Sequence, residues 1–382
     1  MDNKIYKSNV LYFIFFINQI CSIRYFLNSS TFNKDITFFY VYLFLSCAIF
    51  YIIISRKFID FFLSDYFFYT VILIFLVFLI NFYPIQENLK FSLQGSDQDN
   101  CYLDILENIK NKEKFIYSPT YLGNPCSTGL LSFLFYFPLI FWKGYFVIVP
   151  IVFLFLFKIS NLVILNDNKT SNLLTLILIT NLVFLELAVS GSDFISISIS
   201  YLAANIFLIN GFKTNNNNKI IFSFILFLFF FGSRSILLIL IFPLAFIYFI
   251  KFNKLKVTFY FSILALITFT SFILPYYLML PNYFPPFHLI SKSLWYLNNI
   301  KYLLIFLFFI SLFFKNMIFK LIIKNFLLSI LFILISPLLL AGLSGFIYNI
   351  NDLSRWEELN YIFIFLPSLF VFTFATKKLY IK

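Results

Sequence analysis

Apolar residues run along nearly the whole chain, in stretches separated by short polar breaks. Stretches of about 17–25 residues, long enough for a helix to cross a bilayer, recur from one end to the other. We therefore predict an all-α, polytopic integral membrane helix bundle with about 11–13 transmembrane helices. The predicted helices are Val10–Leu27, Ile36–Ser55, Tyr66–Phe82, Tyr145–Leu165, Asn172–Ser190, Phe194–Asn210, Ile220–Phe231, Ile236–Ile250, Val257–Leu280, Tyr302–Phe314, Phe326–Tyr348 and Asn360–Ala375.

The start of the chain resembles the charged region of a signal sequence, with Lys4 and Lys7 ahead of an apolar run. No small-residue cleavage site follows, so Val10–Leu27 is expected to be an uncleaved first helix. Asn18, Gln19 and Arg24 weaken this helix because they are polar or charged.

Several of the short breaks carry basic clusters, which favour the cytoplasmic side of a membrane. If all these clusters are cytoplasmic, both termini also lie inside, as in a multi-pass protein of a bacterial inner membrane. The clusters are Arg56/Lys57, Lys213/Lys219, Lys251/Lys254/Lys256, Lys315/Lys320/Lys324 and Lys377/Lys378/Lys382.

One apolar segment does not fit a simple count of crossings. Leu130–Phe141 is short and contains Pro138, and counting it as a crossing would place the later basic clusters outside. We interpret residues 130–142 as a re-entrant or interfacial segment. It closes a long periplasmic loop, residues 84–129, within a single polytopic domain that spans residues 1–382.

Composition excludes a soluble protein, because 62% of residues are hydrophobic and only 12% are charged. A soluble domain carries roughly 25% charged residues. The net charge of +12 is spread over short loops, so it indicates orientation in the membrane and a lipid environment; it does not indicate a nucleic-acid partner. The 61 Phe and 25 Tyr are interpreted as ordinary lipid-facing residues and not as a cofactor site.

The long outer loop carries the most informative motif, Asp97-Gln98-Asp99. Two carboxylates this close can share a divalent metal, or one of them can act as a general base. The alternative is that they are solvated residues that keep the loop soluble. A short amphipathic helix over Asp104–Lys114 is predicted just downstream.

A second stretch of the loop, Ser118–Pro125, contains two prolines and a glycine that favour an ordered turn. The turn either contributes to a site or only returns the chain to the bilayer. Elsewhere on the outer face, Arg234 is suited to a phosphate group because a guanidinium offers paired donors. Arg234 could instead pair with Asp193 or Glu186, or reach lipid head groups. His288, the one histidine of the chain, is interpreted as a surface residue more readily than as a catalyst.

Four cysteines are present. Cys21 and Cys47 fall in predicted helices and are expected to be inert. Cys101 and Cys126 share the outer loop, where an oxidising periplasm permits a disulfide, and the sequence leaves that bond open. The spacings typical of zinc sites, nucleotide-binding loops and nucleophile elbows are not found in the sequence.

The chain resembles the GT-C superfamily of polytopic glycosyltransferases, loosely, over roughly residues 60–275. It departs from that pattern because its acidic loop follows an apparent third helix and not the first. The matching features are Asp97-x-Asp99, Tyr121-x-Gly123-Asn124-Pro125, the helix junction at Gly191-Ser192-Asp193, and Gly232-Ser233-Arg234 followed by a helix containing Pro243.

This resemblance implies an enzyme that moves a sugar from a polyprenyl-phosphate donor to a glycan, lipid or protein acceptor. Asp97 or Asp99 would be the catalytic base, with a possible divalent metal between them. The expected substrate-binding residues are Asp104, Tyr121, Asn124, Asp193, Arg234 and His288.

Two other functions remain open. One is an O-antigen polymerase or ligase, although that class places its large, arginine-rich outer loop in the second half of the chain. The other is a transporter or flippase for a lipid-linked glycan, although transporters often show two related halves, and no convincing internal repeat is visible here.

Overall fold

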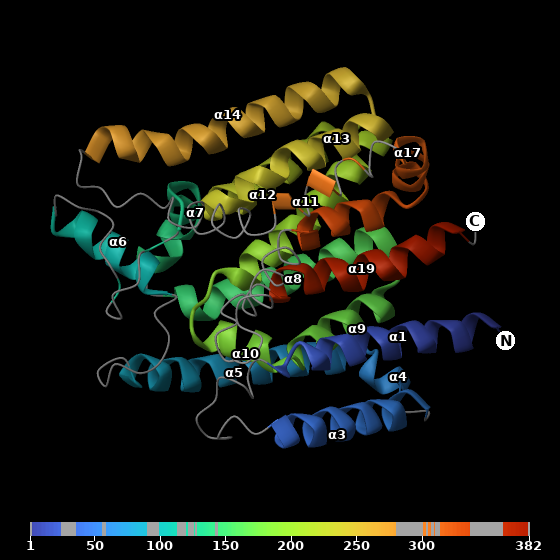
Figure 1. The fold of residues 1–382 in the computed structure, drawn as a ribbon. Helices are drawn as coiled ribbons and strands as arrows, with labels where there is room; N and C mark the ends of the chain where they lie inside the picture. Colours follow the sequence, from blue (N-terminus) through green and yellow to red (C-terminus); the bar gives the residue numbers. More distant parts are fainter. Residues whose placement is uncertain are drawn as a thin grey trace. The chain divides into compact units, whose positions relative to one another are not determined.

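The computed structural model consists of helices joined by turns (Figure 1). It describes residues 2–23, 36–55, 59–89, 99–112, 120, 126, 128–141, 144–279, 301–302, 305–306, 309, 314–336 and 362–380. Within these ranges the structure has no sheet, and a single isolated antiparallel bridge joins Thr128 and Arg234. The predicted all-α class is therefore confirmed.

The helices follow the apolar runs because a helix satisfies its own backbone groups, as a lipid environment requires. Several begin at a polar cap: Asp167, Asn181 and Asn216 accept backbone N–H groups at the starts of α9, α10 and α12. The labelled helices are α1 (Asp2–Ile20), α3 (Ile36–Ser55), α4 (Ile59–Phe62), α5 (Asp65–Leu89), α6 (Asn100–Lys110), α7 (Leu130–Phe141), α8 (Tyr145–Leu165), α9 (Asn168–Ile179), α10 (Leu182–Val189), α11 (Phe194–Thr214), α12 (Asn217–Ser233), α13 (Ile241–Lys251), α14 (Lys254–Met279), α17 (Lys315–Lys324) and α19 (Ile362–Tyr380), with a 3-10 helix η3 (Ser235–Leu240).

Four described helices, α5, α8, α11 and α14, are long and apolar enough to cross a membrane. Two bent helix pairs raise the number of candidate spans to six, so the chain is a multi-pass membrane protein by its helices. Reaching the predicted 11–13 crossings would also require the shorter apolar helices α1, α3, α12, α13 and α19 to cross. That larger number stays a prediction.

The chain divides into two compact units. The first contains residues 1–88, 146–199 and 351–382. Within it α1 packs along α3, where the rings of Phe15 and Phe50 stack with centroids 3.9 Å apart. Helix α19 contacts α1 and α9, and Ser198 at the start of α11 donates to the carbonyl of Ile364 at 2.7 Å.

The second unit contains residues 89–145 and 200–350. Here α7 packs against α6 and α12, while α14 packs against α12 and α13. Buried polar side chains join these helices, as where Tyr248 Oη donates to Asn205 Oδ1 at 2.9 Å. Polar side chains of this kind hydrogen-bond between helices inside a membrane.

The helix predicted over Asn172–Ser190 is broken, which corrects the sequence interpretation. It forms α9 and α10, bent by 72° at Thr180 and Asn181. Asn181 caps the new helix by accepting the N–H of Phe184 at 3.1 Å. Asn18 of α1 donates to the carbonyl of Ile177 at 2.7 Å, which satisfies an acceptor at the end of α9. The polar residues that weaken α1 as a membrane helix therefore stabilise this break.

Further boundaries differ from the prediction: α1 begins at Asp2 and not at Val10, and α6 begins at Asn100 and not at Asp104. Helix α5 continues through Pro84 to Leu89, into the segment predicted as loop, because a proline near a helix end removes only one backbone hydrogen bond. The basic segment Lys315–Lys324, predicted as a break, is itself helix α17. A helix over Phe326–Ser336 follows it at a bend of 112°.

Candidate functional site

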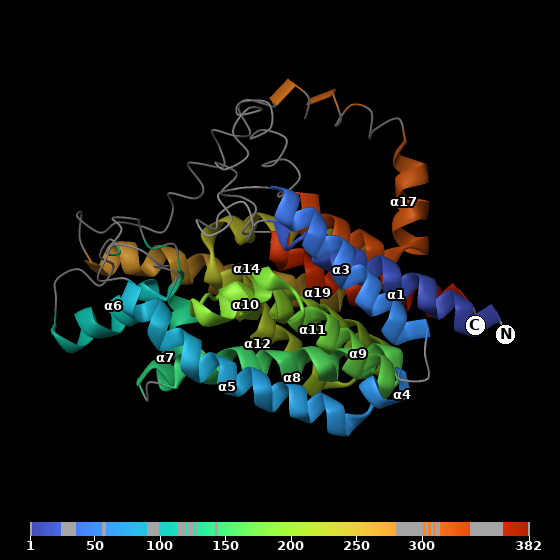
Figure 2. The same cartoon turned by 90° about the horizontal axis from the view of Figure 1, so that it is seen from below.

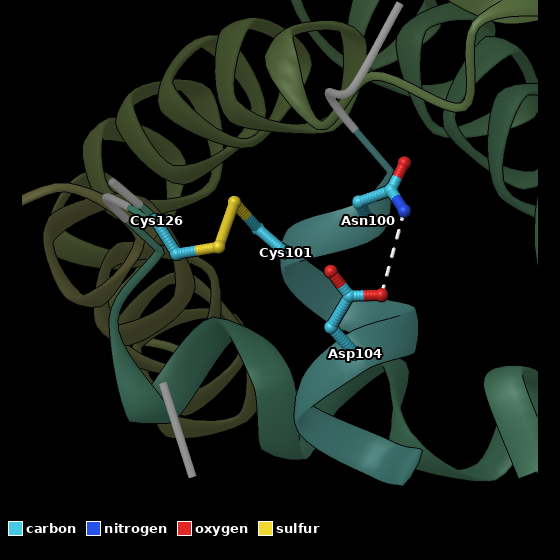
Figure 3. Close-up of a disulfide and its surroundings, with 4 residues drawn as sticks. All are labelled: Asn100, Cys101, Asp104 and Cys126. Atoms are coloured by element: carbon cyan, nitrogen blue, oxygen red, sulfur yellow. Dashed lines mark hydrogen bonds between the residues drawn. A yellow bond between two sulfur atoms is a disulfide. The ribbon is translucent and has the colours of Figure 1, made fainter. Parts of the chain in front are cut away.

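Helix α6 positions Asp99 and Asp104, two of the predicted site residues that the structure describes (Figure 3). A disulfide joins Cys101 in its first turn to Cys126, with the Cα atoms 5.3 Å apart. The bond that the sequence left open is thus present. It anchors the start of α6 to the segment that leads into α7.

Asp99 occupies the position just before α6, where its backbone carbonyl accepts the N–H of Tyr102 at 2.9 Å. The Asp99 side chain is fully buried. Asp104, one turn into α6, is half-buried and accepts a 3.4 Å hydrogen bond from Asn100 Nδ2 (Figure 3). Burying a carboxylate costs free energy unless it is hydrogen-bonded or paired. The surrounding fold therefore determines where the Asp99 carboxylate lies.

Arg234 is tied to the same region by backbone contacts. It lies in extended conformation between α12 and η3, is 7% exposed, and forms the isolated bridge with Thr128. Next to this bridge, the N–H of Gly129 donates to the carbonyl of Ser233 at 2.9 Å.

Two glycines permit this close approach. A Cβ atom at Gly129 would overlap the carbonyl oxygen of Gly232, and a Cβ at Gly232 would lie 2.6 Å from that of Leu131. The backbones of α12 and the segment before α7 therefore touch directly. This contact places the backbone of Arg234 against Thr128. Thr128 follows Cys126, which the disulfide joins to α6.

Asp99, Asp104 and Arg234 therefore lie in one unit, joined by a short path. Asp99 is two residues from Cys101, Cys126 is two residues from Thr128, and Thr128 faces Arg234. A guanidinium and two carboxylates on such a path could serve proton transfer and phosphate binding.

The other predicted site residues have different outcomes. Asp193 belongs to the first unit, where it is fully buried and its carbonyl accepts the N–H of Ile197 at 2.9 Å at the start of α11. Asp97, Tyr121, Asn124 and His288 fall outside the described residues. Within the described ranges, no three acidic, histidine or cysteine side chains gather as metal ligands, so the metal at Asp97 and Asp99 stays a prediction.

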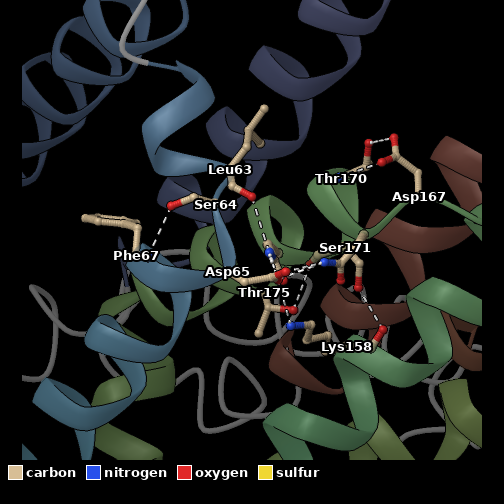
Figure 4. A network of polar contacts seen from close by, with 11 residues as sticks. Leu63, Ser64, Asp65, Phe67, Lys158, Asp167, Thr170, Ser171 and Thr175 are labelled. Atoms are coloured by element: carbon tan, nitrogen blue, oxygen red, sulfur yellow. Dashed lines mark hydrogen bonds and ion pairs between the residues drawn. The ribbon is translucent and has the colours of Figure 1, made fainter.

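A second polar cluster, in the first unit, was not predicted from the sequence (Figure 4). Lys158 of α8 is buried, and its Nζ lies 3.5 Å from Asp65 Oδ1 at the start of α5. Asn168 and Asn172 of α9 donate to the same carboxylate, at 2.7 and 2.8 Å. The available signal was a single lysine inside the apolar run Tyr145–Leu165, because charges at membrane depth usually have a partner or a function.

The ammonium of Lys158 also lies against two aromatic rings, 4.0 Å from the centroid of Phe68 and 5.0 Å from that of Tyr69. Ser171 Oγ donates to the Lys158 carbonyl at 2.7 Å, which holds α9 against α8 (Figure 4). Since the ammonium of Lys158 contacts both Asp65 and two rings, we interpret the cluster as a structural connection between α5, α8 and α9.

Comparison of the chain with protein-family models, with curated proteins and with solved structures gave no match. What the structure establishes is a helical protein with four to six candidate membrane spans in its described part.

Proposed function

We propose that the protein is a membrane glycosyltransferase that moves a sugar from a polyprenyl-phosphate donor to a cell-envelope glycan, lipid or protein acceptor on the outer face. The supporting observation is the short path from Asp99 through the disulfide and the Thr128 bridge to Arg234. It holds a candidate base and a candidate phosphate ligand in one unit. The GT-C resemblance of the sequence supports the same roles.

The proposed reaction is a displacement at the anomeric carbon of the donor sugar. The acceptor hydroxyl oxygen forms the new bond to that carbon, and its proton passes to the carboxylate of Asp99 or Asp97. The bond from the sugar to the phosphate oxygen breaks, and its electron pair leaves with the polyprenyl phosphate. Arg234 stabilises the charge that develops on the departing phosphate.

The disulfide supports the outer location of this site. Disulfides persist in oxidising compartments and are rare where thiols are kept reduced. The Cys101–Cys126 bond in the same loop as Asp99 therefore favours the periplasmic side of the membrane.

The test is sugar transfer by the purified full-length protein in nanodiscs, from a panel of radiolabelled polyprenyl-phosphate sugars. We expect Asp99→Asn or Asp97→Asn to lower kcat by about 10²–10⁴-fold, the usual contribution of a general base. Glu107→Gln is the matched control, because Glu107 is an exposed carboxylate on the same helix α6. It should leave transfer unchanged.

Each variant is checked by thermal melting so that loss of transfer is not loss of folding. If no donor supports transfer by the wild-type protein, and both aspartate variants complement a deletion strain fully, the transferase proposal is wrong. The transporter function would then be tested by following the movement of a lipid-linked glycan across proteoliposomes.

A further inference from the structure

The second unit contains a long stretch of one-signed charge. From residue 194 to residue 351 the sequence has no Asp or Glu, while it carries lysines in every basic break. The carboxylates of this unit that the structure describes are in and beside α6. The ionised side chains of residues 200–350 are therefore all positive.

Three of the lysine-bearing segments are brought together at one end of the unit. The rings of Phe252, in the turn between α13 and α14, and Phe326, just after α17, lie 5.7 Å apart. Phe246 of α13 also contacts Phe319 of α17, with centroids 5.8 Å apart. Lys256 Nζ donates to Asn215 Oδ1 at 2.7 Å, which adds the turn between α11 and α12.

We call the exposed lysines of α17, together with those on either side of the turn between α13 and α14, the basic cluster. Its members are Lys251, Lys254, Lys256, Lys315, Lys320 and Lys324.

Helix α17 has the form of a helix that lies on a membrane surface. None of its residues is buried, and it turns by 112° from the helix Phe326–Ser336. Figure 2 shows α17 running across the direction of α14 in the same unit. If Phe326–Ser336 and α14 follow the membrane normal, α17 lies close to the membrane plane.

The apolar side chains of α17 are exposed together with its lysines. Met317 is 60% exposed and Leu321 is 55% exposed, while Asn316, Lys320 and Lys324 follow one another at helical spacing on one side. A helix with both kinds of surface is stabilised where hydrocarbon and charged head groups meet.

We propose that the basic cluster binds the head groups of anionic phospholipids, with α17 embedded in the membrane surface beside them. An anionic bilayer supplies both negative head groups, which attract exposed lysines, and an apolar layer, which covers Met317 and Leu321. Free phosphate or an acidic soluble protein would supply only the charge. The proposal does not depend on the transferase activity.

The test measures binding of a chain-labelled fluorescent phosphatidylglycerol to the full-length protein in a zwitterionic detergent. We expect Lys320→Gln/Lys324→Gln to weaken binding about 30-fold, which equals about 2 kcal/mol at 1.4 kcal/mol per tenfold. Lys320→Arg/Lys324→Arg keeps the charge and should bind as the wild type does. The control Lys110→Gln/Lys112→Gln removes two exposed lysines of the α6 region. It lowers the net charge of the protein by the same two units as Lys320→Gln/Lys324→Gln.

Three results would overturn the proposal. One is equal binding by the Lys320→Gln/Lys324→Gln variant and the wild type, with both folded by thermal melting. Another is equal loss in the Lys110→Gln/Lys112→Gln control, which would indicate a general charge effect. The third is displacement of the labelled lipid by inorganic phosphate as efficiently as by unlabelled phosphatidylglycerol, which would identify a phosphate site and not a lipid surface.

Discussion

At the scale of single residues, the contacts of Lys158 and Asp65 are unequal. Lys158 is buried among Phe68, Tyr69 and the body of α8, whereas the side chain of Asp65 is 54% exposed. Asp65 would remain hydrated and bonded to two asparagines without its lysine. Lys158 without its aspartate would be left in an apolar surrounding without its counter-ion.

This asymmetry predicts the order of two substitutions. Asp65→Ala should destabilise the protein by about 3 kcal/mol, because it leaves a buried charge without its counter-ion. Lys158→Met should cost only about 1 kcal/mol, since methionine fills the same apolar space and mainly the cation–ring contacts are lost. Thermal and denaturant melts of the purified protein measure both.

The double variant Asp65→Ala/Lys158→Met serves as the control. It should be more stable than Asp65→Ala alone, because the stranded charge is gone. A Lys158→Met protein less stable than Asp65→Ala would show that this account of the pair is mistaken.

Residue chemistry was only partly predictable from the sequence. The reactive candidates Asp99 and Arg234 stand out by type, and the structure places them in one unit. Asp193 looked equivalent to them, but it lies in the other unit and its backbone starts α11. The choice depends on tertiary contacts, such as the Thr128 bridge, which no local pattern encodes.

At the scale of elements, the contact between α12 and the segment before α7 depends on two glycines. Gly129 meets the backbone of Gly232, which cannot move aside without shifting a helix. At Gly211 the closest atom that a new Cβ would meet, at 2.7 Å, belongs to the side chain of Ile220. A side chain can adjust its rotamer, whereas a backbone carbonyl cannot.

Gly129→Ala should therefore destabilise the protein by about 3 kcal/mol or more, and Gly211→Ala by about 1 kcal/mol. Gly129→Ala should also lower sugar transfer, because it separates the Arg234 segment from the segment held by the disulfide. Melting temperature and transfer rate are measured on the same samples. Equal stability of the two alanine variants would contradict the backbone contact.

Apolar run length predicted most helices but missed their breaks. It located α8, α11 and α12 closely, because uninterrupted apolar residues leave few alternatives to a helix in lipid. It joined α9 to α10, because the break at Asn181 is supported by hydrogen bonds to Asn18 of α1, a residue distant in sequence. Helix α17 was missed for the opposite reason, since its lysines resemble a loop when read singly.

At the scale of the whole molecule, the basic breaks and the acidic loop predict opposite sides of the membrane. Lysine-rich loops remain in the cytoplasm, while the disulfide favours an oxidising compartment. Asn253 and Lys112 should therefore be accessible from different sides. The orientation stays a prediction until it is measured.

An antibody epitope inserted after Lys112 should be detected on intact bacterial spheroplasts. The same epitope inserted after Asn253, in the turn between α13 and α14, should be detected only after the membrane is permeabilised, because its neighbours Lys251 and Lys254 retain it inside. Detection of both epitopes on the same side would reject the proposed topology. Detection of the Lys112 epitope only after permeabilisation would reject the outer location of Asp99.

The contact between α1 and the α9–α10 break also has a consequence for biosynthesis. Asn18 bonds to Ile177, which lies 159 residues later in the chain. At about 5–20 residues per second, the ribosome needs about 8–30 s to make that partner. During this interval the amide groups of Asn18 and Gln19 lack their native partners, so newly inserted α1 should be slow to commit to its final position. Its capture by α9 would then be a late step of membrane assembly, and a natural point for a chaperone or insertase to act.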